Sequence, residues 1–71
     1  GDAAVTRALA QAAGVVVAHN HPSGDPSPSP EDVSIAGRLT AAGSLIGVDL
    51  LDFVIIGGAG RYTSFKETGR L

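Results

Sequence analysis

Two histidines stand at a spacing that could bind a metal ion. His19 and His21 are the only histidines of the chain, and they directly follow the apolar run at 15–18. In an extended chain, side chains at positions i and i+2 project to the same side, about 6.5–7 Å apart at Cα. Both imidazoles can therefore reach one ion, while Asn20 faces away.

Asp32 is the natural third ligand, because the loop at 22–31 can turn the chain back toward the histidines. The chain has no cysteine, so a Zn²⁺ site would have to use histidine nitrogen and carboxylate oxygen. Three protein ligands leave a fourth position for water, as in catalytic sites. Bound zinc would lower the pKa of that water to about 7 and polarise a substrate carbonyl. Manganese or iron could occupy the same ligand set.

The same residues also have an ordinary structural interpretation. Ser29 can cap a helix with Pro30 at its first position, and Asp32 three residues on would complete a capping box. Asp25, in Gly-Asp-Pro, is typical of a turn, and Glu31 of the first turn of a helix. A His-x-His pair is common at strand ends, so these residues taken singly leave both interpretations open.

The elements that must position this loop alternate between helix and strand. The alanine-rich segment 2–13 has one apolar face, which predicts a helix with Asp2 at its start and Gly14 at its end. The continuous β-branched run at 15–18 predicts a strand buried on both faces.

The second half of the chain predicts one helix and two strands. The helix should begin at Ser29 and end at Gly43. Strands are expected at 48–58 and 61–65, with 57–60 turning the chain between them. This order of elements indicates an α/β or α+β fold, a mixed sheet with flanking helices.

The sheet is expected to be incomplete. Residues 1–71 make one small domain, and a central strand at 15–18 needs a neighbour on each edge. We therefore expect strands before Gly1 to be missing. An uncovered edge of the strand at 15–18 would pair with a second copy, which predicts a homodimer.

Composition and charge exclude several classes of function. The net charge is −2, which gives no electrostatic reason to bind nucleic acid. No run approaches the roughly 20 apolar residues of a membrane span, and no signal peptide is visible, so a cytoplasmic location is expected. We expect the remaining charges to lie in solvent: Asp49, Asp52, Arg61, Lys66 and Arg70.

The joint pattern is more specific than its parts. The pattern is His-x-His, then seven residues, Ser, two residues and Asp. It resembles the JAMM signature of the JAB/MPN metalloprotease fold, and His19, His21, Ser29 and Asp32 all match. The text "AHNHPSGDPSPSPED", followed by "LLDFVIIG" and "GRYTSF", resembles the RadC family over nearly the whole chain.

This resemblance implies a hydrolase whose substrate is a protein or peptide. Zinc would be held by His19, His21 and Asp32, and its water would attack an amide carbonyl, often of an isopeptide bond. Ser29 would help to stabilise the oxyanion, as a preorganised hydroxyl dipole can. RadC proteins carry an old association with DNA repair, which none of these residues supports.

Two departures from the pattern bear on function. The signature includes an upstream glutamate as general base, and the only acid before His19 is Asp2. The chain thus resembles the C-terminal portion of a RadC-type domain. Phe53 stands where such chains usually carry histidine, and it is expected to be a core aromatic. The alternative function is a non-catalytic protein-interaction scaffold of the same fold.

Overall fold

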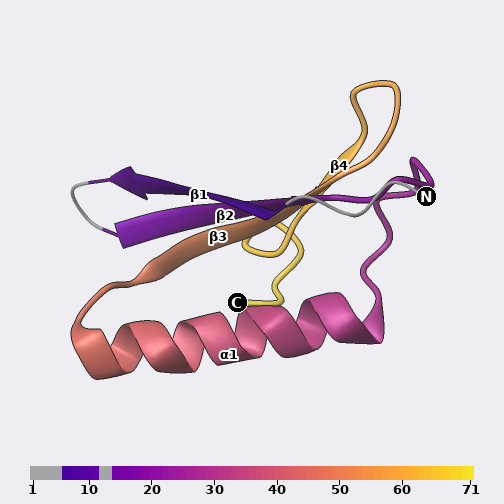
Figure 1. The fold of residues 1–71 in the computed structure, drawn as a ribbon. Helices are drawn as coiled ribbons and strands as arrows, with labels where there is room; N and C mark the ends of the chain where they lie inside the picture. The colour runs from indigo at the N-terminus through magenta and orange to yellow at the C-terminus, as the bar shows by residue number, and fades with distance from the viewer. Residues whose placement is uncertain (1–5, 12–13) are drawn as a thin grey trace.

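A mixed sheet with one helix against one face makes up the described part of the chain (Figure 1). The computed structural model describes residues 6–11 and 14–71. In chain order the elements are β1 (Thr6–Gln11), β2 (Gly14–Asn20), α1 (Pro30–Ile46), β3 (Leu50–Ile56) and β4 (Tyr62–Ser64). The strands lie in the order β1-β2-β3-β4.

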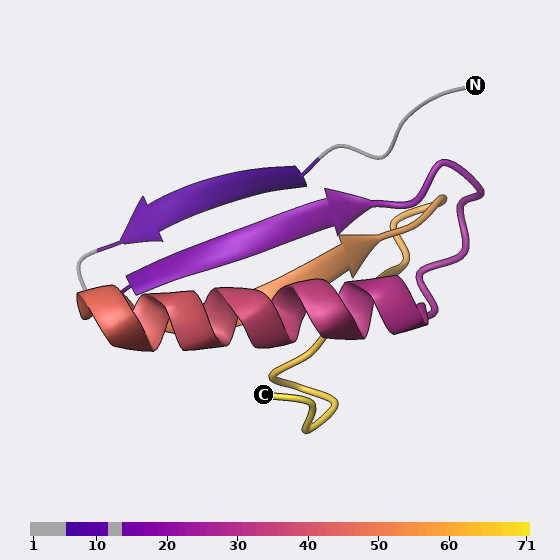
Figure 2. The same cartoon turned by 60° about the horizontal axis from the view of Figure 1, so that its bottom comes forward.

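The unit β2-α1-β3 positions the candidate site. β2 and β3 run parallel with His19 opposite Ile55, and the other strand pairs are antiparallel. Figure 2 shows the first turn of α1 at the same end of the sheet as the carboxyl ends of β2 and β3. Side chains alternate between the two faces of a strand, so residues two apart face the same side. Val17 is buried, and His19 therefore also points toward the core.

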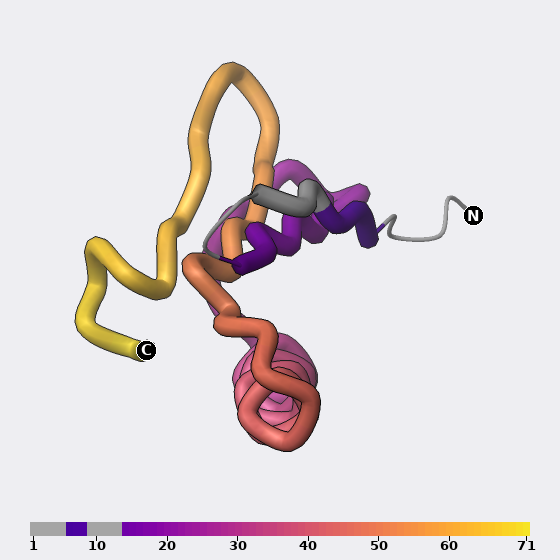
Figure 3. The backbone as a smooth tube through the Cα atoms, turned by 90° about the vertical axis from the view of Figure 1, so that its left-hand side faces the viewer, coloured from indigo at the N-terminus to yellow at the C-terminus, as the bar shows by residue number. Residues whose placement is uncertain are grey.

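The core lies between α1 and the sheet, and Figure 3 shows α1 on one side of the sheet only. Its buried apolar residues are Val17, Ala36, Phe53, Ile55 and Phe65. Phe53 is fully buried, with its ring centroid 5.0 Å from that of Phe65 and 6.3 Å from that of His19. The expectation that Phe53 is a core aromatic is confirmed.

The predicted helix at 2–13 is wrong over the residues that the structure describes. Residues 6–11 form β1, which pairs with β2 from Thr6↔His19 to Gln11↔Gly14. The helix preference of alanine amounts to less than about 1 kcal/mol per residue, so a full ladder of hydrogen bonds to β2 outweighs it. Gly14 begins β2 instead of ending a helix. Asp2, with the rest of 1–5 and 12–13, lies outside the described residues.

The pairing also removes the predicted free edge. β2 has β1 on one side and β3 on the other, so the edges of the described sheet fall on β1 and β4. Within the described sheet the strand at 15–18 therefore has no free edge, and the homodimer stays a prediction without this edge to support it.

Helix α1 begins where the sequence predicts and ends one turn later. Ser29 is its N-cap, and Gly47, with φ of 73°, is its C-cap in the left-handed conformation. Gly43 therefore does not end the helix. It lies inside α1, where the returning chain leaves no room for a side chain: a Cβ at Gly43 would stand 2.1 Å from the carbonyl oxygen of Val48.

This close approach makes a prediction for two glycines of one helix. Gly43→Ala should destabilise the protein by about 1–3 kcal/mol, because the added methyl overpacks against backbone. Gly37→Ala should stabilise it by about 0.5–1 kcal/mol, since a Cβ at Gly37 would have no neighbour within 4 Å. Urea unfolding of both variants measures the difference, and equal stabilities would contradict the close contact.

The predicted strands after α1 are confirmed with narrower bounds as β3 and β4. Asp49 is exposed as expected, but the expectation for Asp52 was wrong. The Asp52 carboxylate accepts hydrogen bonds from the backbone N–H of Phe53 and Lys66 and, at 2.5 Å, from the Ser64 hydroxyl. Asp52 thus joins β3 to the segment after β4.

No helix in the described part of the chain has both the length and the apolar character to cross a bilayer.

Candidate metal centre

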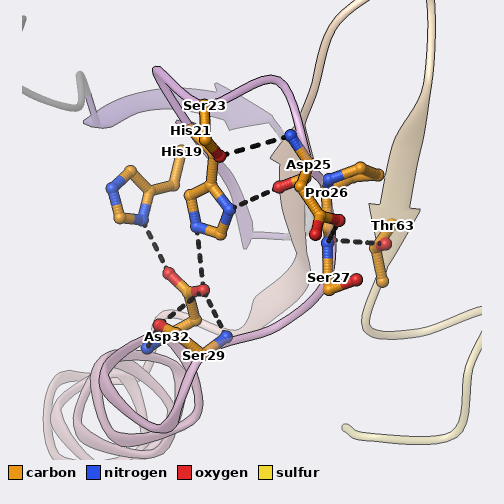
Figure 4. Close-up of polar contacts among 9 residues, drawn as sticks. All are labelled: His19, His21, Ser23, Asp25, Pro26, Ser27, Ser29, Asp32 and Thr63. Atoms are coloured by element: carbon orange, nitrogen blue, oxygen red, sulfur yellow. Dashed lines mark hydrogen bonds and ion pairs between the residues drawn. The ribbon is translucent and has the colours of Figure 1, made fainter.

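Three side chains meet where β2 leads into the loop before α1 (Figure 4). His19 lies near the end of β2, His21 follows directly after it, and Asp32 lies in the first turn of α1. The Nδ1 atom of His19 is 3.0 Å from Oδ1 of Asp32, and Nε2 of His21 is 2.9 Å from Oδ2. The candidate ligand atoms of the three residues all lie within 4.8 Å of one another.

Asp32 completes the capping box and also faces both histidines. Its Oδ2 accepts the Ser29 backbone N–H at 2.8 Å and the Ser29 hydroxyl at 2.9 Å. The Asp32 backbone N–H donates in return to the Ser29 hydroxyl oxygen at 3.1 Å, which completes the capping box. The cap therefore fixes a carboxylate that is only 1% exposed, whose Oδ1 faces His19 and whose Oδ2 faces both Ser29 and His21.

The contacts of His21 define which of its nitrogens carries a proton. Nδ1 lies 2.8 Å from the backbone carbonyl oxygen of Asp25, and because a carbonyl only accepts, Nδ1 is the donor. In a neutral ring Nε2 then carries a lone pair, and that lone pair faces the Asp32 carboxylate. The Nε2 lone pair and the carboxylate oxygen would repel each other at 2.9 Å unless a second proton or a cation lies between them.

His19 and Asp32 present a second pair of this kind. Nδ1 of His19 and Oδ1 of Asp32 are both buried, and neither has a hydrogen-bond partner among the described residues. They lie 3.0 Å apart, yet their alignment does not make a hydrogen bond. Buried polar atoms without a partner are uncommon and costly. Two histidine nitrogens and a carboxylate oxygen within 4.8 Å of one another are a donor set that could hold a metal ion.

The surroundings favour an ionised carboxylate beside His21. Burial works against ionisation of Asp32, but the hydrogen bonds from Ser29 and the contact with His21 hold the pKa of its carboxyl below the usual value. The hydrogen bond to the Asp25 carbonyl, together with Asp32 itself, raises the pKa of the His21 ring. A metal ion would therefore compete with a proton for Nε2 of His21.

Sequence reasoning placed Asp25 in a turn, and the structure confirms this, because its Oδ1 accepts the backbone N–H of Ser27 at 2.9 Å. It missed the second role of Asp25, whose carbonyl orients His21. Histidines that bind metals usually donate their other N–H to such a group. A backbone carbonyl leaves no mark on residue type, so the sequence held no signal for it. Glu31 lies exposed in the first turn of α1, as expected.

Comparison with known proteins identifies the family. The family model described as "RadC-like JAB domain" matches residues 3–70, so the chain belongs to the RadC-like JAB domain family. The mixed sheet with its helix is consistent with part of a JAB/MPN fold, as the sequence predicted.

Several similar proteins carry the name UPF0758 protein. The one from Methanosarcina acetivorans is 52% identical over 61 residues, which cover 86% of this chain and 26% of that protein. The one from Shouchella clausii is 56% identical over 57 residues, covering 80% and 24%. A Clostridium botulinum relative is 54% identical over 59 residues, covering 83% and 25%. The chain thus spans about a quarter of the length of these curated relatives.

Proposed function

We propose that this domain binds one zinc ion through His19, His21 and Asp32 and belongs to a metal-dependent hydrolase of amide or isopeptide bonds. The observation that carries the proposal is the pair of buried atoms, Nδ1 of His19 and Oδ1 of Asp32, that face each other without a hydrogen bond. Membership of the RadC-like JAB domain family supports it.

The donor set suits zinc and a reaction at a carbonyl. When bound, zinc would supply a Lewis acid and a water of lowered pKa. His21 offers Nε2, because its Nδ1 proton is held by the Asp25 carbonyl. Asp32 offers Oδ1, because Ser29 already donates two hydrogen bonds to Oδ2. His19 offers Nδ1, and its ring lies edge-on to both His21 and Phe53.

The predicted oxyanion role of Ser29 is a separate part of this proposal. The Ser29 hydroxyl donates to Oδ2 of Asp32 and accepts from the Asp32 backbone. To stabilise an oxyanion it would have to turn its proton from Asp32 toward the substrate. Its hydrogen bonds support, first of all, a role in orienting Asp32.

A general base would have to come from residues outside the cluster. Within the described part of the chain, the group that could hold a metal contains one carboxylate, Asp32. A water-activating base must lie within hydrogen-bond reach of the reacting water. We therefore expect these 71 residues alone to bind zinc but to hydrolyse peptides poorly. Robust zinc-dependent peptidase activity of the segment alone would contradict this.

The alternative function is a protein-interaction scaffold of the same fold. Replacing both His19 and His21 with alanine in the whole protein separates the two functions. A hydrolase should lose both its bound zinc and its turnover of internally quenched peptides. A scaffold should lose the zinc and keep its binding partners, which affinity capture before and after substitution would show.

A further inference from the structure

The loop that carries His21 is held from outside by the turn that follows β3. We call residues 21–29 the histidine loop and residues 57–61 the hairpin turn. The carbonyl oxygen of Gly24 accepts the backbone N–H of Gly58 at 2.8 Å and Nη2 of Arg61 at 2.7 Å. Nε of Arg61 also donates to the Gly58 carbonyl at 3.1 Å, so one guanidinium ties the two segments together.

A second tie lies two residues further along the histidine loop. The Thr63 hydroxyl, in the middle of β4, donates to the Pro26 carbonyl at 2.8 Å (Figure 4). The backbones also fit tightly: a Cβ at Gly57 would stand 2.4 Å from the Gly24 oxygen and 2.9 Å from Cδ of Pro26. A Cβ at Gly58 would meet nothing closer than 3.6 Å.

These ties surround Asp25, whose carbonyl accepts the Nδ1 proton of His21. Gly24 is held on one side of Asp25 and Pro26 on the other, so the direction of the Asp25 carbonyl is fixed by the hairpin turn and Thr63. The sequence had indicated that Arg61 is a solvated charge. Arg61 is indeed exposed, but its guanidinium also makes two hydrogen bonds to backbone carbonyls, which the sequence did not indicate.

We propose that Arg61 and Thr63 are positioning residues for the metal centre, which keep His21 in the tautomer whose Nε2 is free to bind metal. They act through the Asp25 carbonyl and do not touch the metal ligands themselves. The inference rests on the proposed function in one respect, because it assumes that His21 binds a metal ion. The tautomer itself exists with or without metal, and this makes the proposal separately testable.

The test measures the His21 tautomer in the metal-free protein, from the nitrogen chemical shifts of its ring in mildly alkaline buffer, and then the zinc affinity. The wild-type ring should carry its proton on Nδ1. Thr63→Val combined with Arg61→Met should give a mixture of tautomers and weaken zinc binding about tenfold, the low end of the effect of partners behind metal ligands. The control variant Thr63→Ser keeps the hydroxyl, and its tautomer and zinc affinity should match those of the wild type.

A matched pair of glycines tests the same contact by steric means. Gly57→Ala should disturb the tautomer as the double variant does, whereas Gly58→Ala should leave it unchanged, since only the former lacks room for a methyl. An unchanged tautomer in the folded Thr63→Val, Arg61→Met protein would overturn the inference. If the wild type binds no zinc, the proposed function fails, while the tautomer comparison still decides the role of Arg61 and Thr63.

Discussion

Replacing Asp32 with asparagine is expected to weaken zinc binding by at least about 100-fold, or about 2.7 kcal/mol at 25 °C. The carboxylate supplies the only negative charge among the three grouped ligand residues. Among the described residues, its Oδ1 accepts no hydrogen bond that would compete with a metal ion. Losing partners that merely stand behind metal ligands costs about 10–100-fold, and the loss of a ligand should cost more. Competition titration against a chromogenic zinc chelator measures the change.

The helix itself should survive this substitution. An asparagine oxygen can still accept the Ser29 N–H, so the main loss is the interaction of the charge with the helix dipole, about 0.3–1 kcal/mol. Glu31→Gln is the matched control, because it removes a charge from the same turn at an exposed position. Zinc affinity of Asp32→Asn equal to that of Glu31→Gln would exclude Asp32 as a ligand.

Zinc should raise the thermal unfolding midpoint by about 10–20 °C when its free concentration is about 100 times the dissociation constant. A ligand that binds only the folded state stabilises it by about 2.7 kcal/mol under that condition. For a domain of 60–100 residues, each kcal/mol moves the midpoint by about 4–8 °C. The physical reason is local: the ion would join β2 to α1 at buried atoms that make no hydrogen bond within the described part of the chain. Scanning calorimetry before and after addition of a chelator measures the shift.

Two controls make this shift specific. Mg²⁺ prefers oxygen ligands in an octahedral shell, so it should leave the midpoint unchanged. His21→Ala should unfold at the same temperature with and without zinc. A zinc-induced shift that persists in His21→Ala would place the ion elsewhere.

Local patterns predicted the elements that position the site, and they failed where tertiary pairing decides. The strand before His19, the cap at Ser29 and the strands after α1 all follow from residue types over a few positions. Residues 6–11 are rich in alanine, yet they pair along β2, because a ladder of hydrogen bonds is invisible to local propensity. Gly43 was wrongly predicted to end the helix, because glycine is typical of helix ends. Only the fold shows that the Val48 carbonyl passes beside Gly43 and leaves no room for a side chain.

The grouping of the three candidate ligand residues could be predicted from the sequence, whereas the contacts that support them could not. Spacing along a strand brings His19 and His21 to one side, and the cap brings Asp32 to meet them. The capping and ligand interpretations of Asp32 competed in the sequence, but the structure is compatible with both, since Oδ2 accepts from Ser29 while Oδ1 faces His19 and Oδ2 also faces His21. His21 contacts the Asp25 carbonyl within one loop, and Arg61 reaches the Gly24 carbonyl from the other side of the fold. Both acceptors are backbone carbonyls, which residue types do not encode.

The most direct test of the account is the amount of zinc that the protein retains after exposure to one equivalent of the metal and removal of unbound ions. Elemental analysis should find about one zinc per chain in the wild type and almost none after replacement of His19 and His21 with alanine. A wild-type protein that emerges without zinc, or that retains as much as the doubly substituted protein, would contradict a metal centre at these three residues.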